Sequence, residues 1–209
     1  MSSERELNMS RKSIPRHRAC RRLGVSVCGA VNCPLGRRPT PPGQHGAARR
    51  QKDTQFGLQL KETQKLRAYY GISAKQLRRY YSEAASSREQ TNVALVQKLE
   101  CRLDSMAYRM GFACSLRASR QMVVHRHFLV NGKSVNKPGF QIKPDDTVQL
   151  RPKSQKVERY LEWFKFYDPK LPYVQKDIEK LTGSLTQIPE REEIPILVED
   201  QLVVEFMAR

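Results

Sequence analysis

Hydrophobic positions along the chain form a helical middle section followed by shorter runs of alternating pattern. Apolar side chains return every three or four positions between residues 58 and 126, which is the spacing of one helix face. Capping residues mark several ends: Gly71 and Gly111 follow two of the periodic runs, Ser73 with Gln76 forms a capping box, and Ser115 precedes the last run. The pattern therefore predicts helices over residues 58–71, 73–87, 91–111 and 116–126.

After residue 127 the hydrophobic period changes to two. Short apolar runs between Phe128 and Leu150 are separated by turn sequences, of which Asn131-Gly132 is a strong signal for a tight hairpin. Residues 154–167 have a helical pattern again, and the remaining chain, including residues 202–206, is expected to form short strands.

The first 57 residues show no sustained period. Three prolines within residues 37–51 remove backbone donors and fix φ, which excludes a helix or a central strand there. We expect an extended basic arm that becomes ordered against a polyanion. Together the patterns predict an α+β protein with three segments: the arm plus a helical domain (1–99), a compact module of two helices and a small sheet (100–153), and a C-terminal helix with strands that pack back on the N-terminal helices (154–209).

Charge is concentrated at the start of the chain. The 209 residues carry a formal net charge of +17, and residues 1–80 hold 18 basic and 4 acidic side chains whereas residues 153–209 hold 9 and 11. A concentrated basic field attracts polyanions, so this distribution favours a nucleic-acid partner over a merely solvated surface.

Two classes of protein are excluded by the apolar and cysteine content. No apolar run approaches the roughly 18 residues that span a bilayer, and the N-terminus lacks the apolar stretch of a secretory signal. We therefore expect no membrane partner and a reducing compartment, in which five cysteines do not form a disulfide framework. Glu4 and Glu6 weigh against an organellar transit peptide without excluding one.

Residues 102–136 (RLDSMAYRMGFACSLRASRQMVVHRHFLVNGKSVN) closely resemble one family, the S4 family of small-subunit ribosomal proteins and its RNA-binding module. The resemblance continues through residues 40–46 (TPPGQHG), 56–81 and 199–209 in the same order, so it covers nearly the whole chain. It implies a primary binder of small-subunit rRNA that organises a junction of the 5′ domain, assists assembly, contacts neighbouring ribosomal proteins and contributes to decoding accuracy near the path by which mRNA enters. mRNA is left open as a further partner, and the expected location is a ribosome, in a bacterial cytoplasm or an organelle.

The residues themselves supply candidates for RNA contact. Cations and hydrogen-bonding side chains at spacings of three and four share one face of the helix after Ser115, with Met122 and Val123 on the core side. One guanidinium group can donate two parallel hydrogen bonds to phosphate oxygens. Folded RNA is recognised mainly through the shape of its backbone. Tyr69, Tyr70, Tyr80 and Tyr81 are either stacking platforms or core residues. The candidate RNA contacts are Arg21, Arg22, Arg37, Arg38, His45, Arg49, Arg50, Arg67, Arg78, Arg79, Arg117, Arg120, Gln121, His125, Asn131 and Lys133.

A metal site is predicted in the arm. His17 and Cys20 are separated by two residues and Cys28 and Cys33 by four, and pairs at such spacings converge on one tetrahedral zinc ion. Some members of the S4 family carry zinc here with four cysteines, so the resemblance supports one zinc ion. The alternative is a pair of buried thiols with His17 on RNA. Cys101 and Cys114 are expected to be core residues.

Two other functions compete with rRNA binding. Arg102-Leu103-Asp104 resembles the catalytic triplet of pseudouridine synthases, but Ala107 stands where those enzymes have threonine and no catalytic domain remains. We expect Asp104 to pair with Arg102 or Arg109 instead. A zinc-dependent DNA-binding regulator would need a recognition helix and usually a symmetric dimer, for which the sequence gives no signal. The sequence therefore predicts a protein that is not an enzyme and has no small-molecule substrate.

Overall fold

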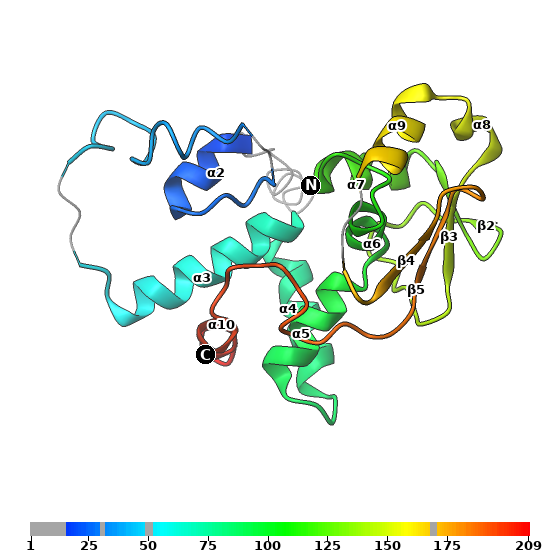
Figure 1. Ribbon diagram of the computed structural model, residues 1–209. Coiled ribbons are helices and arrows are strands. Elements are labelled where there is room, and N and C mark those ends of the chain that lie inside the picture. The colour runs from blue at the N-terminus through cyan, green and yellow to red at the C-terminus, as the bar shows by residue number, and fades with distance from the viewer. Residues whose placement is uncertain (1–15, 30–31, 49–51, 168–170) are drawn as a thin grey trace, which may run out of the picture. The chain divides into compact units, whose positions relative to one another are not determined.

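The computed structural model describes residues 16–29, 32–48, 52–167 and 171–209 (Figure 1). A run of helices is followed by an antiparallel sheet with further helices, which is the segregated order of an α+β protein and confirms the predicted fold class. None of the described helices has the length and apolar character needed to cross a bilayer. The elements are α2 (Arg16–Leu23), α3 (Gln55–Tyr70), α4 (Ala74–Ala85), α5 (Thr91–Glu100), α6 (Leu103–Arg109), α7 (Leu116–Val124), β1 (Phe128–Val130), β2 (Lys133–Ser134), β3 (Thr147–Leu150), α8 (Pro152–Gln155), α9 (Glu158–Phe166), β4 (Val174–Asp177), β5 (Thr182–Leu185) and α10 (Asp200–Met207).

The chain forms two compact units. The first contains the described residues up to Arg79 together with Leu197–Arg209, and the second contains Tyr80–Ile196. The sequence predicted three segments instead, with bounds 1–99, 100–153 and 154–209. That division into domains stays a prediction.

In the first unit, local capping sets the limits of α3. The Thr54 hydroxyl accepts a hydrogen bond from the Gly57 N–H at the start of the helix. At its end Gly71 adopts the left-handed conformation with φ 60°, and its N–H bonds to the Arg67 carbonyl. Both features satisfy backbone groups that a helix end leaves free, as the sequence predicted for Gly71.

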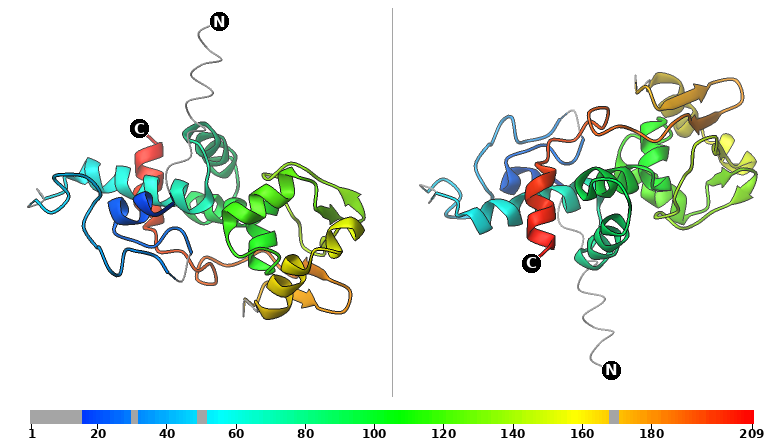
Figure 2. Two further views of the ribbon diagram at one scale, coloured as in Figure 1. Left: turned by 90° about the horizontal axis from the view of Figure 1, so that it is seen from above. Right: turned by 90° about the horizontal axis from the view of Figure 1, so that it is seen from below.

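The C-terminal segment is helix α10, so the expected strand over residues 202–206 is wrong. α10 lies against α3 in all three views of Figures 1 and 2. Gln59 donates to Glu205 at 2.9 Å, the rings of Phe56 and Phe206 lie 5.7 Å apart, and Val203 is fully buried. Tertiary packing of one apolar helix face therefore prevails over the strand preference of valine and phenylalanine.

The second unit contains an antiparallel sheet in the order β2-β1-β3-β5-β4. The predicted hairpin is confirmed: Val130 pairs with Lys133, and Asn131 (φ 48°) and Gly132 (φ 76°) form the turn between β1 and β2. Two positive φ values are what a two-residue turn of the favoured twist requires. The core between the helices and the sheet contains Met106, Met110, Met122, Val123, Phe128, Val130, Val148, Leu150, Phe164 and Leu185.

The single helix expected over residues 91–111 is interrupted, which corrects the prediction. α5 ends at Glu100, and Arg102 takes an extended conformation that forms an isolated β-bridge with Gln141. At the first residue of α6, the Leu103 N–H donates to the Phe140 carbonyl at 2.8 Å. The hydrophobic period continues across the break because apolar residues of both short helices are buried. A similar break separates α8 from α9 within residues 154–167.

Candidate metal cluster and nucleic-acid interface

Three of the four predicted metal ligands lie together in the first unit. The ligand atoms of His17, Cys28 and Cys33 all lie within 4.8 Å of one another. His17 projects from α2, and its Nδ1 lies 3.9 Å from the Sγ of Cys28. The loop after α2 therefore returns two thiols to the side of the helix that carries the histidine.

Cys20, the fourth predicted ligand, borders this group from the next turn of α2. Its side chain is fully buried and packs with Leu23 and Val27 against Cys28 and Cys33. Burial, together with the neighbouring thiols of Cys28 and Cys33, raises the pKa of Cys20 to about 12. Thiols crowded in this way stay protonated by themselves, and a cation is the partner that would let them ionise.

The donor set fits zinc. Ligand atoms of a tetrahedral zinc site with sulfur and nitrogen donors lie about 3.5–3.8 Å apart, so the 3.9 Å between Cys28 and His17 needs only a small contraction. One imidazole and three thiols are ligands that zinc prefers, and the small apolar cluster beside them has only Cys20, Leu23 and Val27 as its buried members. His17, Cys28 and Cys33 thus form a cluster of the ligand types that zinc prefers, and Cys20 packs beside it.

Cys114 does not behave as predicted. Cys101 is buried as expected, but Cys114 is exposed in the turn before α7. The chain leaves the core after Ala113 because Ser115 must present its hydroxyl to the Ala118 N–H at the helix start. Apolar neighbours in the sequence did not reveal this change of direction.

The arginines of the arm have different surroundings. Arg21 donates from Nε to the Thr40 carbonyl at 3.0 Å and from Nη2 to the Pro41 carbonyl at 3.3 Å, so it fastens the following loop to α2. Arg37 and Arg38 are exposed in the turn after Pro34. His45 is exposed as well, and Arg49 and Arg50 lie outside the described residues.

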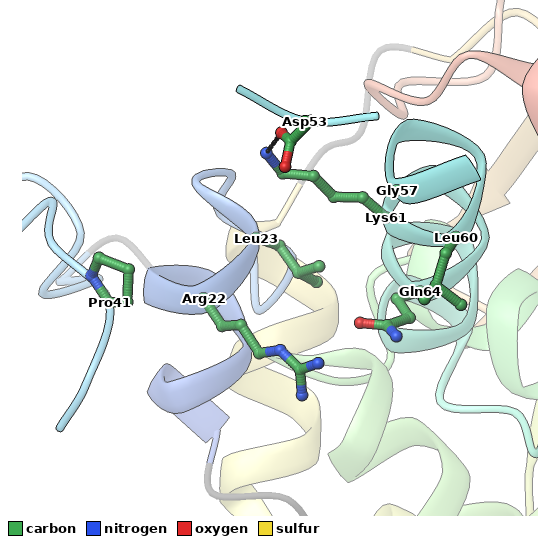
Figure 3. Close-up of a pocket in the computed structure, with 8 residues that line it drawn as sticks. All are labelled: Arg22, Leu23, Pro41, Asp53, Gly57, Leu60, Lys61 and Gln64. Atoms are coloured by element: carbon green, nitrogen blue, oxygen red, sulfur yellow. Dashed lines mark hydrogen bonds and ion pairs between the residues drawn. The ribbon is translucent and has the colours of Figure 1, made fainter. Parts of the chain in front are cut away.

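Arg22 lines a separate hollow between α2 and α3 (Figure 3). In this view Arg22 and Gln64 extend from the two helices into the space between them, while Lys61 pairs with Asp53 at 3.1 Å. The Asp53 carboxylate compensates the charge of Lys61. The guanidinium group directed into this hollow is that of Arg22.

The aromatic and basic residues of α3 and α4 divide between core and surface. Tyr70 and Tyr80 are buried, which assigns them to the core rather than to stacking on RNA, whereas Tyr69 and Tyr81 are half-buried. Arg78 and Arg79 are exposed. Arg67 is half-buried, its pKa is lowered by burial, and its Nε is buried without a hydrogen-bond partner among the described residues.

Helix α7 has the two-sided character that its sequence predicted. Met122 and Val123 are buried, and Arg117, Gln121 and His125 are exposed on the other side. Arg120 forms an ion pair on this helix: its Nη1 lies 3.3 Å from the Asp104 carboxylate, and its side chain is 36% exposed. Its charge is therefore partly committed within the protein.

The two predicted RNA contacts at the hairpin between β1 and β2, Asn131 and Lys133, have different roles. The Asn131 side chain donates to Asp146 at 2.7 Å and accepts from the Thr147 N–H at 2.9 Å, so it holds the turn against the neighbouring loop. Lys133 is exposed at the start of β2. Of these two candidates, Lys133 has the freer side chain.

The Arg-Leu-Asp triplet is structural. Arg102 and Asp104 are buried and form a two-pronged ion pair at 2.9 and 2.6 Å, and Arg102 also donates to the Tyr80 hydroxyl. The expected pairing of Asp104 with Arg102 is confirmed, whereas Arg109 pairs with Glu100. A carboxylate enclosed by its own arginine has no open side for a substrate.

Arg18, a basic residue of the arm, was not among the predicted RNA contacts. This exposed side chain lines a hollow together with His17, Arg21, Arg37 and Arg38. Arg18 and Arg21 are three residues apart on α2, each directly after a predicted metal ligand, and this repeated spacing was the available signal.

Comparison with known proteins covers both units. Residues 11–100 match the family model for the ribosomal protein S4/S9 N-terminal domain, and residues 101–148 match the model for the S4 domain. The small ribosomal subunit protein uS4 of Geobacillus sp. (strain WCH70) is 40% identical over 201 residues, and uS4A of Symbiobacterium thermophilum is 41% identical over 208. The uS4 protein of Rubrobacter xylanophilus is 41% identical over 201 residues, and each alignment covers 96% of this chain and 100% of the relative. The chain therefore belongs to the S4 family of small ribosomal subunit proteins, as its motifs indicated, and is a structural ribosomal protein rather than an RNA-modifying enzyme.

Proposed function

We propose that the protein is a primary binder of small-subunit rRNA that organises a junction of the 5′ domain and assists assembly of the subunit. The names of its relatives and the match to both family models support a place in the small ribosomal subunit. The observation that carries RNA binding is the division of α7, which presents Arg117, Gln121 and His125 to solvent while its opposite side is core. Contacts with neighbouring ribosomal proteins, with mRNA and with the decoding process belong to the same proposal through the family resemblance.

Binding of this kind depends on backbone contacts. Guanidinium groups bind phosphate oxygens in a planar, paired geometry, and an ammonium group binds them as a point charge. Each phosphate that a cation neutralises releases counterions, so affinity falls with salt in proportion to the number of contacts. Arg117 and Lys133 are both exposed and both belong to the second unit, so we propose them as two of these contacts.

A double variant, Arg117→Gln with Lys133→Gln, is expected to bind 5′-domain rRNA more weakly while keeping its fold. Loss of two phosphate contacts should reduce the log–log salt dependence by about 1.4–1.8. Binding titrations at several salt concentrations give this slope directly, and circular dichroism checks the fold.

The matched control is Lys180→Gln, which also removes a cation from the second unit. Lys180 has a 78% exposed side chain within the near-neutral segment 153–209 and lies near Asp177. We expect its slope to equal that of the unmodified protein. An unchanged affinity and slope in the double variant would show that α7 and the hairpin do not face RNA.

We further propose that His17, Cys20, Cys28 and Cys33 hold one zinc ion. The close approach of His17, Cys28 and Cys33, with Cys20 packed beside them, supports this assignment. Bound zinc supplies a cross-link between α2 and the loop that follows it. Because this part of the arm buries little apolar surface, the four side chains would orient the loop mainly through the ion.

A further inference from the structure

Beside the metal cluster lies a hollow of about 420 Å³ whose lining is strongly basic. This volume falls in the range of about 300–1,000 Å³ typical of ligand sites, so it accommodates more than a single small ion. Its lining residues are His17, Arg18, Arg21, Pro34, Arg37, Arg38 and Pro42.

Among the described residues that line this hollow, none balances its positive charge. Four of the seven lining residues are arginines and none is acidic. The chain contains no acidic residue at all between Glu6 and Asp53. Four guanidinium groups around one hollow repel one another, and a polyanion that enters it relieves this repulsion.

One wall of the hollow is helix α2, in which metal ligands and pocket residues alternate. His17 is followed by Arg18 and Cys20 by Arg21. Because neighbouring residues on a helix point about 100° apart, a helix that turns His17 and Cys20 toward the thiol cluster also fixes the direction of the two arginines. His17 itself belongs to both the cluster and the lining of the hollow.

The other wall is the turn that begins at Cys33. The N–H groups of Arg37 and Arg38 both bond to the Pro34 carbonyl, at 3.2 and 2.8 Å, so these arginines sit on a compact turn directly after a metal ligand. Arg21 reaches across to the carbonyls of Thr40 and Pro41 and so ties α2 to the chain that follows the turn. The metal cluster and Arg21 thus join the same two walls.

We propose that this hollow binds phosphodiester groups of an RNA strand, and that phosphate binding and metal binding are coupled because the metal ligands position both of its walls. The proposal rests on the rRNA-binding function and on the zinc site proposed above. Linkage requires the coupling to be reciprocal: metal raises the affinity for RNA by the same factor by which RNA raises the affinity for metal.

The test measures zinc affinity of the full chain by competition with a chromophoric chelator, with and without saturating 5′-domain rRNA. We expect RNA to raise zinc affinity by about 5–150-fold, the usual range of coupling between two sites. In the double variant Arg18→Gln with Arg38→Gln, one equivalent of zinc should still bind without RNA, but the coupling factor should fall toward one. Neither residue is a metal ligand, so a loss of coupling in this variant is not a loss of the metal site.

Arg117→Gln serves as the matched control because it removes a guanidinium group from α7, outside this hollow. It should weaken RNA binding and leave the coupling factor unchanged. A coupling factor near one in the unmodified protein, or one that the Arg18 and Arg38 substitutions leave intact, overturns the inference. If RNA binds tightly while the coupling is absent, only this inference fails, whereas absence of RNA binding overturns the proposed function together with it.

Discussion

Protein carrying Cys28→Ser is expected to lose most of its bound metal, whereas protein carrying His17→Cys keeps about one equivalent. A serine hydroxyl is a poor zinc ligand and leaves three donors, but a cysteine at position 17 completes a set of four thiolates. Metal analysis of protein purified under reducing, chelator-free conditions measures the stoichiometry. Loss of the ion should loosen α2 and the loop after it first, because the second unit has its own core.

Cys114→Ser is the control for general thiol effects, since Cys114 is exposed in the other unit. Its metal content should match that of the unmodified protein. If the unmodified protein contains no metal, the zinc proposal is wrong, and the apolar cluster around Leu23 and Val27 together with the Arg21 bonds holds the described part of the arm.

Asp104→Ala is expected to destabilise the second unit by about 3–5 kcal/mol, because it leaves the buried guanidinium of Arg102 without its carboxylate. Asp104 also accepts a hydrogen bond from the Ser105 N–H, which loses its partner in the same variant. Urea unfolding followed by fluorescence measures the effect. Trp163 is the only tryptophan and packs against the core of this unit, so its emission reports the relevant transition.

Arg120→Ala removes the other cation that contacts Asp104 and is the matched control. Its side chain is 36% exposed and Arg102 remains in place, so we expect a loss of at most about 1 kcal/mol. If the two variants lost the same free energy of unfolding, the Asp104 carboxylate would be stabilised mainly by Arg120 rather than by Arg102. A small loss for Asp104→Ala would mean that water reaches Arg102 readily once the carboxylate is gone.

Helix limits were predictable where neighbouring residues determine them. The Ser73 hydroxyl and the Gln76 side chain exchange hydrogen bonds with each other's backbone N–H groups at the start of α4, as the capping box predicts. Gly71 and Ser115 likewise act within four residues of their own position. Signals of this range are visible in a single sequence.

Errors arose where distant segments decide the structure. Residues 202–206 form a helix because they lie on α3, about 140 residues earlier in the chain, as the separation of 146 between Gln59 and Glu205 illustrates. The break at Arg102 depends on a backbone pairing with Gln141. Neither partner can be identified from the local pattern of apolar residues.

In the candidate site, too, local spacing was informative whereas contacts with distant residues were not predictable. Ligand spacing predicted the approach of Cys28 to His17, because two close pairs on a short arm have few other ways to converge. The roles of Arg21 and Asn131 in holding their own loops depend on carbonyl and carboxylate partners 15 to 20 residues away, which the sequence did not reveal. The charge of Arg21 and the hairpin position of Asn131 marked them as contacts, but neither signal separates a structural side chain from one that faces RNA.

The most direct test of the central claim, that this chain binds small-subunit rRNA through its basic arm and α7, is crosslink mapping on small ribosomal subunits isolated from cells that express it. The account predicts that the chain co-sediments with these subunits and that its rRNA crosslinks concentrate in residues 16–48 and 115–134. Residues 171–209, in a segment with more acidic than basic side chains, should carry few. A chain that stays apart from the subunits, or crosslinks concentrated in residues 171–209, would contradict the account.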